Sequence, residues 1–381
     1  METVYLDNGA TTPICKDAVD AMNKVISEEY GNPSGVYTKG VEAKGIINRA
    51  RTDIAASLKA FDNEIYFTSG GSESDNWALV GTALKAGKGH IISTAIEHHA
   101  VMNTLNTLGS LGYGISFAKP DSGGFVSADS VLSLIRPDTF LISMMLVNNE
   151  TGVYQPVSEV GAAARKRGII MHTDAVAAVG KVPVDVNSLN VDLLSASAHK
   201  FHGPKGTGFL YIRRGTPISP FIYGGGQEMG MRGGTENTPC VAGMNAALKY
   251  SESHFLDSVD KQKKLKQLLF DLIKEKIPDV RLNGYIDSDK TAPWCLNISI
   301  PGIVGTSLLI LLDMKGICAS TGATCNQSSK EPSHVLTAMG RSKEEAASSI
   351  RFTLSFENTE EEIRYTADVL AESVRYLRSM N

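Results

Sequence analysis

The sequence predicts an α/β fold, with a mainly parallel sheet and flanking helices in a large domain and a smaller α+β domain beside it. Three observations lead to this prediction. Short apolar strands alternate with helical stretches from about residue 64 to 212, which is typical of right-handed crossovers between parallel strands. The pattern changes near residue 250, where a long helix follows. A chain of 381 residues also exceeds the usual size of one compact core.

The alternating region is predicted element by element. Short apolar runs indicate strands at 64–68, 90–94, 140–147, 169–173, 193–197 and 208–212. Helices are expected at 75–85, from His98 onward, and at 157–167 with Ser158 as the N-cap residue. Because ligands in such sheets gather beyond the carboxyl ends of the strands, the turns after these strands should carry the site.

The smaller domain is predicted from the rest of the chain. A helix at 255–276 places leucines on one face and ends before Pro278. Strands are expected at 296–300 and 351–355, and helices at 307–314 and 360–378. Chain ends often lie close together, so the first residues should join this part. We therefore predict a large domain of residues 15–254 and a small domain of residues 1–14 and 255–381.

Composition excludes several classes of protein. The net charge of −4 gives no general attraction to nucleic acid or anionic lipid. No run of about 18 apolar residues is present, and the N-terminus lacks the pattern of a signal peptide. The cysteines are odd in number and scattered, without a C-x-x-C pair, which favours a reducing compartment. We predict a cytoplasmic protein that binds neither nucleic acid nor membrane.

One glycine-rich turn has the features of an anion site. In Thr68-Ser-Gly-Gly-Ser-Glu-Ser-Asp75 a strand passes through two glycines into a helix. Backbone N–H groups and the helix dipole would face a bound anion there. Gly71 would allow close approach, and Ser72 would add a hydroxyl donor. The stretch matches neither a Walker loop nor G-x-G-x-x-G, and a simple tight turn between strand and helix is an equal alternative.

A lysine follows the predicted strand at 193–197. Lys200 lies between two histidines in Ser197-Ala-His-Lys-Phe-His-Gly. Partial burial would lower its pKa and make its amine nucleophilic, although most lysines are solvated. His199 and His202 form an H-x-x-H pattern, but no further clustered ligands follow. We therefore predict no metal site.

Two further residues occupy strand ends. Asp174 ends an apolar strand, where a carboxylate needs a cation or hydrogen bonds; a helix N-cap would also explain it. His98 begins a helix, where a structural role is the more common one. A phosphate cradle, an activatable lysine, a buried acid and an aromatic ring together match pyridoxal 5'-phosphate, which has a phosphate, an aldehyde and a basic ring nitrogen.

Cys325 stands in Ala319-Ser-Thr-Gly-Ala-Thr-Cys-Asn-Gln-Ser-Ser-Lys-Glu-Pro332, a run of small polar residues without apolar periodicity. A structural cysteine prefers an apolar, buried environment, whereas a reactive thiol needs access and help to ionise. From this stretch alone, an unimportant surface thiol and a reactive one are equally good interpretations.

Several motifs together resemble the cysteine desulfurases. They are Leu6-Asp-Asn-Gly-Ala-Thr-Thr-Pro13, Tyr30-Gly-Asn-Pro-Ser34, Ser197-Ala-His-Lys-Phe-His-Gly-Pro-Lys-Gly206, Gly225-Gly-Gln-Glu-Met-Gly-Met-Arg-Gly-Gly-Thr-Glu-Asn237 and Ser320-Thr-Gly-Ala-Thr-Cys325. They are most similar to the NifS/IscS-like branch, which supplies sulfur for nitrogenase and general iron–sulfur cluster assembly. The resemblance covers nearly the whole chain. It implies the fold-type I aminotransferase architecture, a homodimer, L-cysteine as substrate, and an iron–sulfur scaffold or other sulfur-acceptor protein as partner.

The resemblance also implies residue roles. Lys200 would hold the cofactor covalently, His98 would stack on its ring, and Asp174 would pair with the ring nitrogen. The cofactor's phosphate would be bound by Gly71, Ser72, Ser197 and His199, and by Thr235 of the other subunit. Arg351 would bind the substrate carboxylate with a bidentate fork, assisted by Asn149. Cys325 would take the sulfur of L-cysteine as a persulfide, leaving L-alanine.

The chain departs from the family pattern at a few positions. Ala177 stands where a glutamine usually bonds the cofactor's phenolic oxygen, so a catalytically impaired member is one alternative. Tyr37 replaces a frequent histidine, and residues 323–324 are Ala-Thr rather than Ser-Ala. An aminotransferase, a selenocysteine lyase and a non-catalytic sensor on the same fold are further alternatives.

Overall fold

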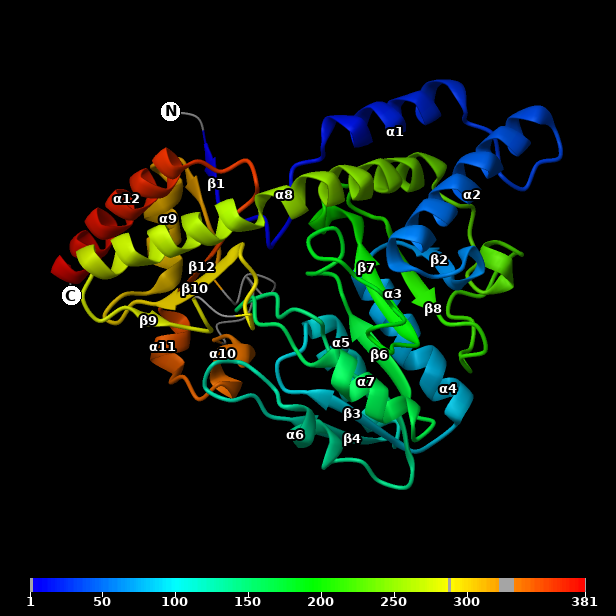
Figure 1. The fold of residues 1–381 in the computed structure, drawn as a ribbon, viewed down its shortest axis with the longest axis horizontal. Helices are drawn as coiled ribbons and strands as arrows, with labels where there is room; N and C mark the ends of the chain where they lie inside the picture. The colour runs from blue at the N-terminus through cyan, green and yellow to red at the C-terminus, as the bar shows by residue number, and fades with distance from the viewer. Residues whose placement is uncertain (1–2, 287–288, 322–331, 381) are drawn as a thin grey trace.

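The computed structural model describes residues 3–286, 289–321 and 332–380. Two groups of elements lie beside each other, and one long helix, α8 (Thr238–Lys276), runs along both (Figure 1). Cys325 lies outside the described residues, so its predicted role is not tested by the fold.

The larger group is built on one seven-stranded sheet with the order β2-β8-β7-β6-β5-β3-β4. From β7 to β4 all neighbours pair in parallel, and only β8 runs antiparallel to both of its neighbours. The predicted mainly parallel sheet is therefore confirmed. The strands are β2 (Ile65–Thr68), β3 (His90–Thr94), β4 (Gly114–Ala118), β5 (Thr139–Ser143), β6 (Ile170–Asp174), β7 (Leu193–Ser197) and β8 (Gly208–Ile212).

Helices cover both faces of this sheet, because alternate strand residues point to opposite faces. Ile92 and Ile142 belong to a core that also contains residues of α2 (Thr38–Leu58) and α7 (Val157–Arg165). The adjacent Ile91 and Leu141 pack instead with α4 (Thr82–Ala86) and α5 (His99–Ser110). The remaining helical segments of this group are α1 (Lys16–Glu28), η1 (Asp62–Glu64), α3 (Gly71–Asn76), η2 (Trp77–Gly81), α4 (Thr82–Ala86), α5 (His99–Ser110), α6 (Ala128–Leu132), η3 (Ala198–Lys200) and η4 (Glu228–Gly230).

The smaller group has a separate core around an antiparallel sheet of the order β12-β10-β9. The first residues of the chain join it, since β1 pairs in parallel with β11. Its elements are β1 (Val4–Tyr5), β9 (Arg281–Leu282), β10 (Cys295–Ser299), α9 (Gly305–Asp313), β11 (Ile317–Cys318), α10 (His334–Ala338), α11 (Lys343–Ala347), β12 (Ser349–Thr353) and α12 (Glu360–Ser379).

Helix α8 begins earlier than the sequence predicts. Its N-cap is Asn237, whose side chain accepts a hydrogen bond from the backbone N–H of Cys240, and a proline occupies its first turn. Val241 and Met244 pack in the core of the larger group, and Leu265 and Leu269 in that of the smaller group. The proposed domain boundary after residue 254 falls inside this helix and stays a prediction.

Other local predictions also need correction. Ser158 is not the N-cap of α7: the cap position is Pro156, and the Ser158 hydroxyl donates instead to the carbonyl of Ser188 at 2.7 Å. The strand expected at 140–147 ends at Ser143, and the helix expected at 75–85 contains the π-helical segment η2. Within the described ranges, no helix combines the length and apolarity that crossing a bilayer requires.

Candidate active site

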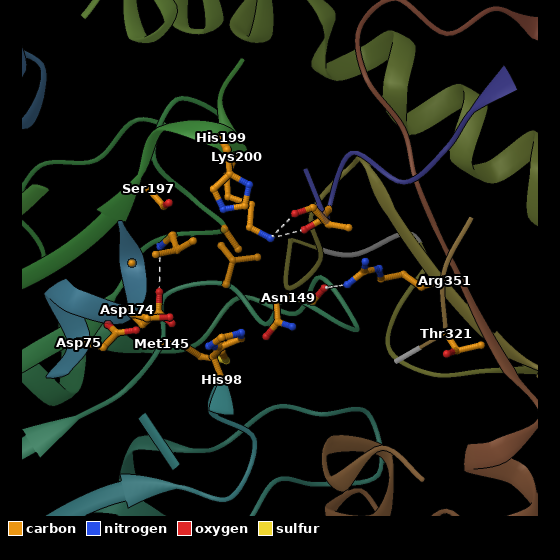
Figure 2. Close-up of a pocket in the computed structure, with 17 residues that line it drawn as sticks. Asp75, His98, Met145, Asn149, Asp174, Ser197, His199, Lys200, Thr321 and Arg351 are labelled. Atoms are coloured by element: carbon orange, nitrogen blue, oxygen red, sulfur yellow. Dashed lines mark hydrogen bonds between the residues drawn. The ribbon is translucent and has the colours of Figure 1, made fainter. Parts of the chain in front are cut away.

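A cavity of ≈ 280 Å³ collects most of the residues that the sequence singled out. Figure 2 shows their side chains converging on it from both parts of the chain. Thr235 is exposed and is not among the lining residues, and Cys325 lies outside the described residues. The predicted site residues that line the cavity are Gly71, Ser72, His98, Asn149, Asp174, Ser197, His199, Lys200 and Arg351.

One end of the cavity is formed by backbone rather than by large side chains. Gly70 has φ 143°, a conformation that favours glycine. A Cβ at Gly71 would meet Val176 Cγ2 at 2.7 Å, so only glycine fits where α3 begins. Gly71, Ser72, Ser197 and His199 line both this cavity and an adjoining open hollow. These predicted phosphate residues are thus brought together around the N–H groups of a helix start.

Two buried carboxyl groups lie on the side of the cavity away from Arg351 (Figure 2). Asp174 accepts a hydrogen bond from the backbone N–H of Val176 at 2.9 Å, and burial raises its pKa to about 6. Asp75, from α3, lines the same cavity, and its Oδ1 has no hydrogen-bond partner among the described residues. Burial, followed by the charge of Asp174, raises the pKa of Asp75 well above its usual range.

A third buried acid lies behind these two. Glu97 accepts hydrogen bonds from the Thr94 hydroxyl at 2.5 Å and from the backbone N–H of Met145 at 3.1 Å. Burial raises its pKa to about 8. Like charges cannot all be ionised in one apolar region, so Glu97 stays protonated at neutral pH. Of the three acids, Asp174 is the one whose pKa the charge of Lys200 lowers against the effect of burial, so it is the one that ionises first.

His98 is the N-cap residue of α5, and its ring lines the cavity near these acids. Its Nδ1 accepts the backbone N–H of Ala100 at 3.1 Å, and burial lowers its pKa to about 4. The imidazole is therefore neutral at pH 7. Asp75, His98 and Asp174 each bring one atom within 4.8 Å of the others. A metal ion would also accept that spacing, so the absence of a metal stays a prediction.

Lys200 projects into the cavity from the short turn after β7. Its Nζ donates to the backbone carbonyls of Gly9 at 2.5 Å and Ala10 at 2.9 Å. These carbonyls come from the N-terminal segment, which crosses from the smaller group to the mouth of the cavity. The amine is thereby aimed by backbone groups at a fixed position between the acid end and the arginine end (Figure 2).

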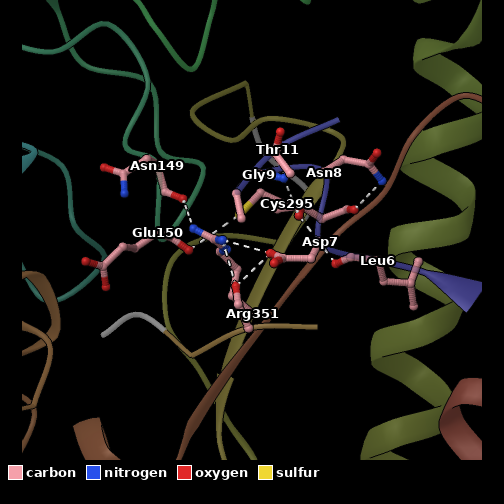
Figure 3. Close-up of polar contacts among 12 residues, drawn as sticks. Leu6, Asp7, Asn8, Gly9, Thr11, Asn149, Glu150, Cys295 and Arg351 are labelled. Atoms are coloured by element: carbon pink, nitrogen blue, oxygen red, sulfur yellow. Dashed lines mark hydrogen bonds and ion pairs between the residues drawn. The ribbon is translucent and has the colours of Figure 1, made fainter. Parts of the chain in front are cut away.

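Arg351, in β12, closes the far end of the cavity (Figure 3). Its Nη2 donates to Asp7 Oδ1 at 3.0 Å and to Ser320 Oγ at 2.7 Å. Its Nη1 donates to the backbone carbonyl of Asn149 at 2.8 Å. Within the described ranges, Nε of Arg351 and Oδ1 of Asn149 have no hydrogen-bond partner. Buried polar atoms without partners are costly, and both can bind a ligand here.

Two functional positions were missed by the reasoning from sequence. The sequence predicts no separate role for Asp7 within its motif, yet its carboxylate holds the guanidinium of Arg351. For Asp75 the sequence predicts only the start of a helix, yet its side chain lines the cavity beside Asp174. For Asp75, the signal was a carboxylate one helical turn after the glycines, on the same face as Gly71. For Asp7, no local signal exists, because its partner lies 344 residues away.

Comparison with known proteins now identifies the chain. The model of the aminotransferase class-V family matches residues 4–365. The chain belongs to the class-V aminotransferase family. Its predicted resemblance to the cysteine desulfurases is confirmed by similarity to a protein named cysteine desulfurase IscS from Methanosarcina thermophila, at 46% identity over 100% of this chain and 94% of the relative. A putative cysteine desulfurase IscS 1 from Bacillus subtilis is 40% identical over 99% of this chain and 100% of its own.

Solved structures agree with the predicted fold-type I architecture. A NifS-like protein superposes with a TM-score of 0.92 at 37% identity, covering 98% of this chain and 100% of its own. A structure described as SspA in complex with cysteine gives a TM-score of 0.82 at 36% identity, covering 92% of this chain and 99% of its own.

The enzymes of this family depend on pyridoxal phosphate, and the cavity fits that cofactor. Asp75 Oδ1 has no hydrogen-bond partner among the described residues; it lies 3.6 Å from Nε2 of His172, whose pKa burial lowers to about 3. Burial raises the pKa of Asp174, so a cation such as a protonated ring nitrogen would stabilise its carboxylate. The glycine start of α3 leaves room that a side chain would fill. The groups that would hold the cofactor are Lys200, His98 and the four predicted phosphate-binding residues, Gly71, Ser72, Ser197 and His199.

Proposed function

We propose that this protein is a cysteine desulfurase that takes sulfur from L-cysteine, releases L-alanine and carries the sulfur as a persulfide on Cys325. The observation that carries the proposal is the cavity that joins Lys200, Asp174 and Arg351 in a chain whose full-length relatives are named cysteine desulfurases. An amino acid placed there meets a carboxylate-binding group at one end and an amine base near the middle.

Arg351 and Asn149 would bind and orient the substrate. The guanidinium Nε and the amide Oδ1 lack partners among the residues described, so they suit the carboxylate and the ammonium of an amino acid, respectively. Because Asp7, Ser320 and the Asn149 carbonyl already hold the guanidinium, the substrate carboxylate would bind without first ordering the side chain.

Lys200 would act as the general base at Cα. When bound, pyridoxal phosphate supplies an electron sink for the bond broken at Cα. The Lys200 amine accepts the Cα proton, and the backbone carbonyls of Gly9 and Ala10 stabilise the ammonium that results. Asp174, as the ionised acid, keeps the acid end of the cavity negative while His98 stays neutral.

Sulfur transfer would use the Cys325 thiolate as nucleophile. It attacks Sγ of the substrate, so an S–S bond forms while the Cβ–S bond breaks and its electron pair stays on the carbon fragment. That fragment gains a proton and leaves as L-alanine. The enzyme thiol is oxidised to a persulfide and the C–S bond is reduced, so no external oxidant is required. Thr321, four positions earlier in the sequence, is the last described residue before Cys325 and lines the cavity.

The test is Cys325→Ala, with Cys240→Ala as the matched control, because Cys240 is a free cysteine in α8 that lines neither the active-site cavity nor the hollow that adjoins it. We expect Cys325→Ala to keep the visible cofactor absorbance but to form no persulfide, and its alanine formation should fall at least about 100-fold. The control should match the parent protein. Undiminished sulfide release from L-cysteine by Cys325→Ala would refute the nucleophile, and pyruvate with a new amino acid as products would indicate an aminotransferase.

The remaining parts of the proposal concern partners. We propose a homodimer in which Thr235, which is exposed in the single chain, reaches the phosphate of the other subunit's cofactor. A sulfur-acceptor protein, such as an iron–sulfur scaffold, would receive the persulfide in the cytoplasm. Sedimentation of the full chain should give twice the monomer mass. Thr235→Ala should weaken cofactor binding without changing the mass.

A further inference from the structure

The start of helix α10 is held by two hydrogen bonds that the proposed chemistry does not use. Ser333, the N-cap residue, donates its hydroxyl hydrogen to Oε2 of Glu150 at 2.5 Å, and both side chains are buried. Nε2 of the next residue, His334, donates to the backbone carbonyl of Glu97 at 2.8 Å. Both acceptors are distant in the sequence, so these contacts fix α10 against other elements of the fold.

The two acceptors are sequence neighbours of residues that line the active-site cavity. Glu150 follows Asn149 in the sequence, and Asn149 lines the cavity. Glu97 precedes His98, which lines it too, whereas neither acid is itself a lining residue. Figure 3 shows the Glu150 side chain pointing away from Arg351. The Glu150 carboxyl is therefore not placed to contact a ligand in the cavity, but it can support the residues around it.

The backbone at Glu150 is fixed by contacts that its side chain does not make. Oδ1 of Asn148 accepts the backbone N–H of Glu150 at 3.0 Å. The Glu150 carbonyl accepts a hydrogen bond from Nδ2 of Asn297 at 3.0 Å. A change of the Glu150 side chain should therefore leave Asn149 in place and act on Ser333 instead.

Glu150 is a costly side chain at this position. Burial raises the pKa of its carboxyl to about 7, against the effects of the Ser333 hydrogen bond and the charge of Arg351. Burying a carboxyl group lowers stability in a way that burying an apolar side chain does not. The contact with Ser333 therefore points to a role other than stability.

The chain is also fixed before Cys325. The backbone N–H of Ser320 donates to the carbonyl of Arg351 at 3.1 Å, and Nη2 of Arg351 donates to the Ser320 hydroxyl at 2.7 Å. Residues 322–331 lie outside the described part of the chain, and the contacts of Ser320 and Ser333 hold the chain on either side of them. Fixing the second end of a tethered segment reduces the space that it explores, which raises the effective concentration of its groups near a target.

We propose that Glu150 is a positioning residue for sulfur transfer. Its carboxyl, acting through Ser333, fixes the chain eight residues after Cys325 and thereby favours the approach of the thiol to the cavity. Glu150 touches neither substrate nor cofactor in this role. The inference rests on the proposed function, because it concerns the step in which Cys325 takes the sulfur.

The test is Glu150→Ala in the full-length holoenzyme, with Glu252→Ala as the matched control. Glu252 also accepts a hydrogen bond from a serine, Ser57, but it lines a different cavity. Single turnovers with L-cysteine give substrate affinity from the cofactor absorbance and persulfide on Cys325 from mass spectrometry. We expect the persulfide to form about 10-fold more slowly in Glu150→Ala, with affinity unchanged and the control at the parent rate. A parent-like rate, or a loss of affinity as large as the loss of rate, would overturn the proposal.

A conservative variant separates the hydrogen bond from the charge. Glu150→Gln keeps an oxygen that accepts the Ser333 hydroxyl, so it should restore a rate close to that of the parent. If Glu150→Gln is as slow as Glu150→Ala, the charge matters rather than the hydrogen bond, and the positioning role is wrong. The unfolding midpoint reports whether each variant is folded.

Ser333→Gly removes the same hydrogen bond from the other side. Glycine is accepted at an N-cap, and Val335 and Leu336 keep α10 packed in the core, so this variant should fold. It should be as slow as Glu150→Ala, and the double variant should be no slower than either single variant. Effects that multiply in the double variant would show that the two side chains act independently, contrary to the proposal.

Failure of this inference differs from failure of the proposed function. If Cys325→Ala still releases sulfide at the parent rate, the desulfurase proposal fails. If the rate depends on Cys325 but not on Glu150, only the positioning role fails.

Discussion

The two ends of the active-site cavity are built in opposite ways. At the acid end, Asp174 and Asp75 come from neighbouring elements of one core, and burial leaves them with raised pKa values. At the arginine end, the charge is already balanced, because Asp7, Ser320 and the Asn149 carbonyl surround the Arg351 guanidinium. The two carboxyl groups of the acid end would gain a cation only from a ligand, whereas the Arg351 side chain is already held in position.

Because of this difference, the acid end should mainly affect the stability of the apoprotein, and the arginine end should mainly affect substrate binding. Buried carboxyl groups without a cation destabilise the folded chain, and a bound cation would reverse that cost. A guanidinium held by three partners costs little and leaves its Nε for the substrate. The cofactor should therefore stabilise the protein strongly, and the substrate should add little.

Lys200→Ala should give the largest effect, because it removes the amine that stands between the two ends. We expect the visible cofactor absorbance to disappear and alanine formation to fall at least about 10⁴-fold. Lys263→Ala is the matched control, since Lys263 is exposed and lines neither the cavity nor the adjoining hollow. An unchanged visible spectrum in Lys200→Ala would show that another group holds the cofactor.

Arg351→Lys should act on the arginine end alone. Lysine keeps the charge but loses the planar fork, so we expect kcat/KM for L-cysteine to fall roughly 30-fold, about 2 kcal/mol, mainly through KM. Cofactor affinity should stay unchanged. Arg341→Lys is the control, because Arg341 bonds Asn283 at 2.9 Å away from the cavity. Loss of cofactor binding in Arg351→Lys would mean that the two ends are not independent.

Asp174→Asn tests the acid end through pH. The pKa of Asp174 is raised from 3.8 to about 6 in the folded chain, so the folded apoprotein binds this proton more tightly than the unfolded chain does. Apoprotein stability should therefore fall as pH rises from about 4 to 6. Asp174→Asn has no carboxyl group to titrate at this position, so it should not lose this stability. Its free energy of unfolding relative to the parent apoprotein should therefore rise by about 3 kcal/mol over that window.

Urea unfolding of the two apoproteins between pH 4 and 7 measures this difference. With the cofactor added, the order should reverse, because the variant loses the carboxylate that pairs with a cationic ring. A stability difference that does not change with pH would show that the pKa of Asp174 is not raised in the folded apoprotein.

Ala177→Gln should give the smallest effect. Ala177 lines the cavity at a position where the resemblance predicts a glutamine. A new hydrogen bond is worth about 0.5–1.5 kcal/mol, so we expect turnover to rise about 2- to 10-fold and the pH dependence of the cofactor absorbance to shift. Val176→Ala, at the next cavity-lining position, controls for a change of volume. Equal spectra for Ala177→Gln and the parent protein would show that the side chain does not reach the cofactor.

Sequence reasoning succeeded where the cause is local. Gly71 and Lys200 follow β2 and β7, and Asp174 is the last residue of β6. Strand alternation alone predicted that these strand ends share one edge of the sheet. The arginine end was not predictable in that way, because Asp7 and Arg351 meet only through the pairing of distant segments. The extended start of α8 was also missed, since its first turns face a different core from its last.

The Asp7–Arg351 ion pair has a consequence for how the molecule is made. Every lining residue of the acid end lies at or before Lys200, and β8, which joins β2 to β7 in the sheet, follows at Gly208–Ile212, so the strands that carry that end are complete long before synthesis ends. The substrate's anchor needs Arg351, which emerges close to the end of synthesis, to return to the seventh residue. A nascent chain can therefore capture its vitamin well before it can recognise an amino acid.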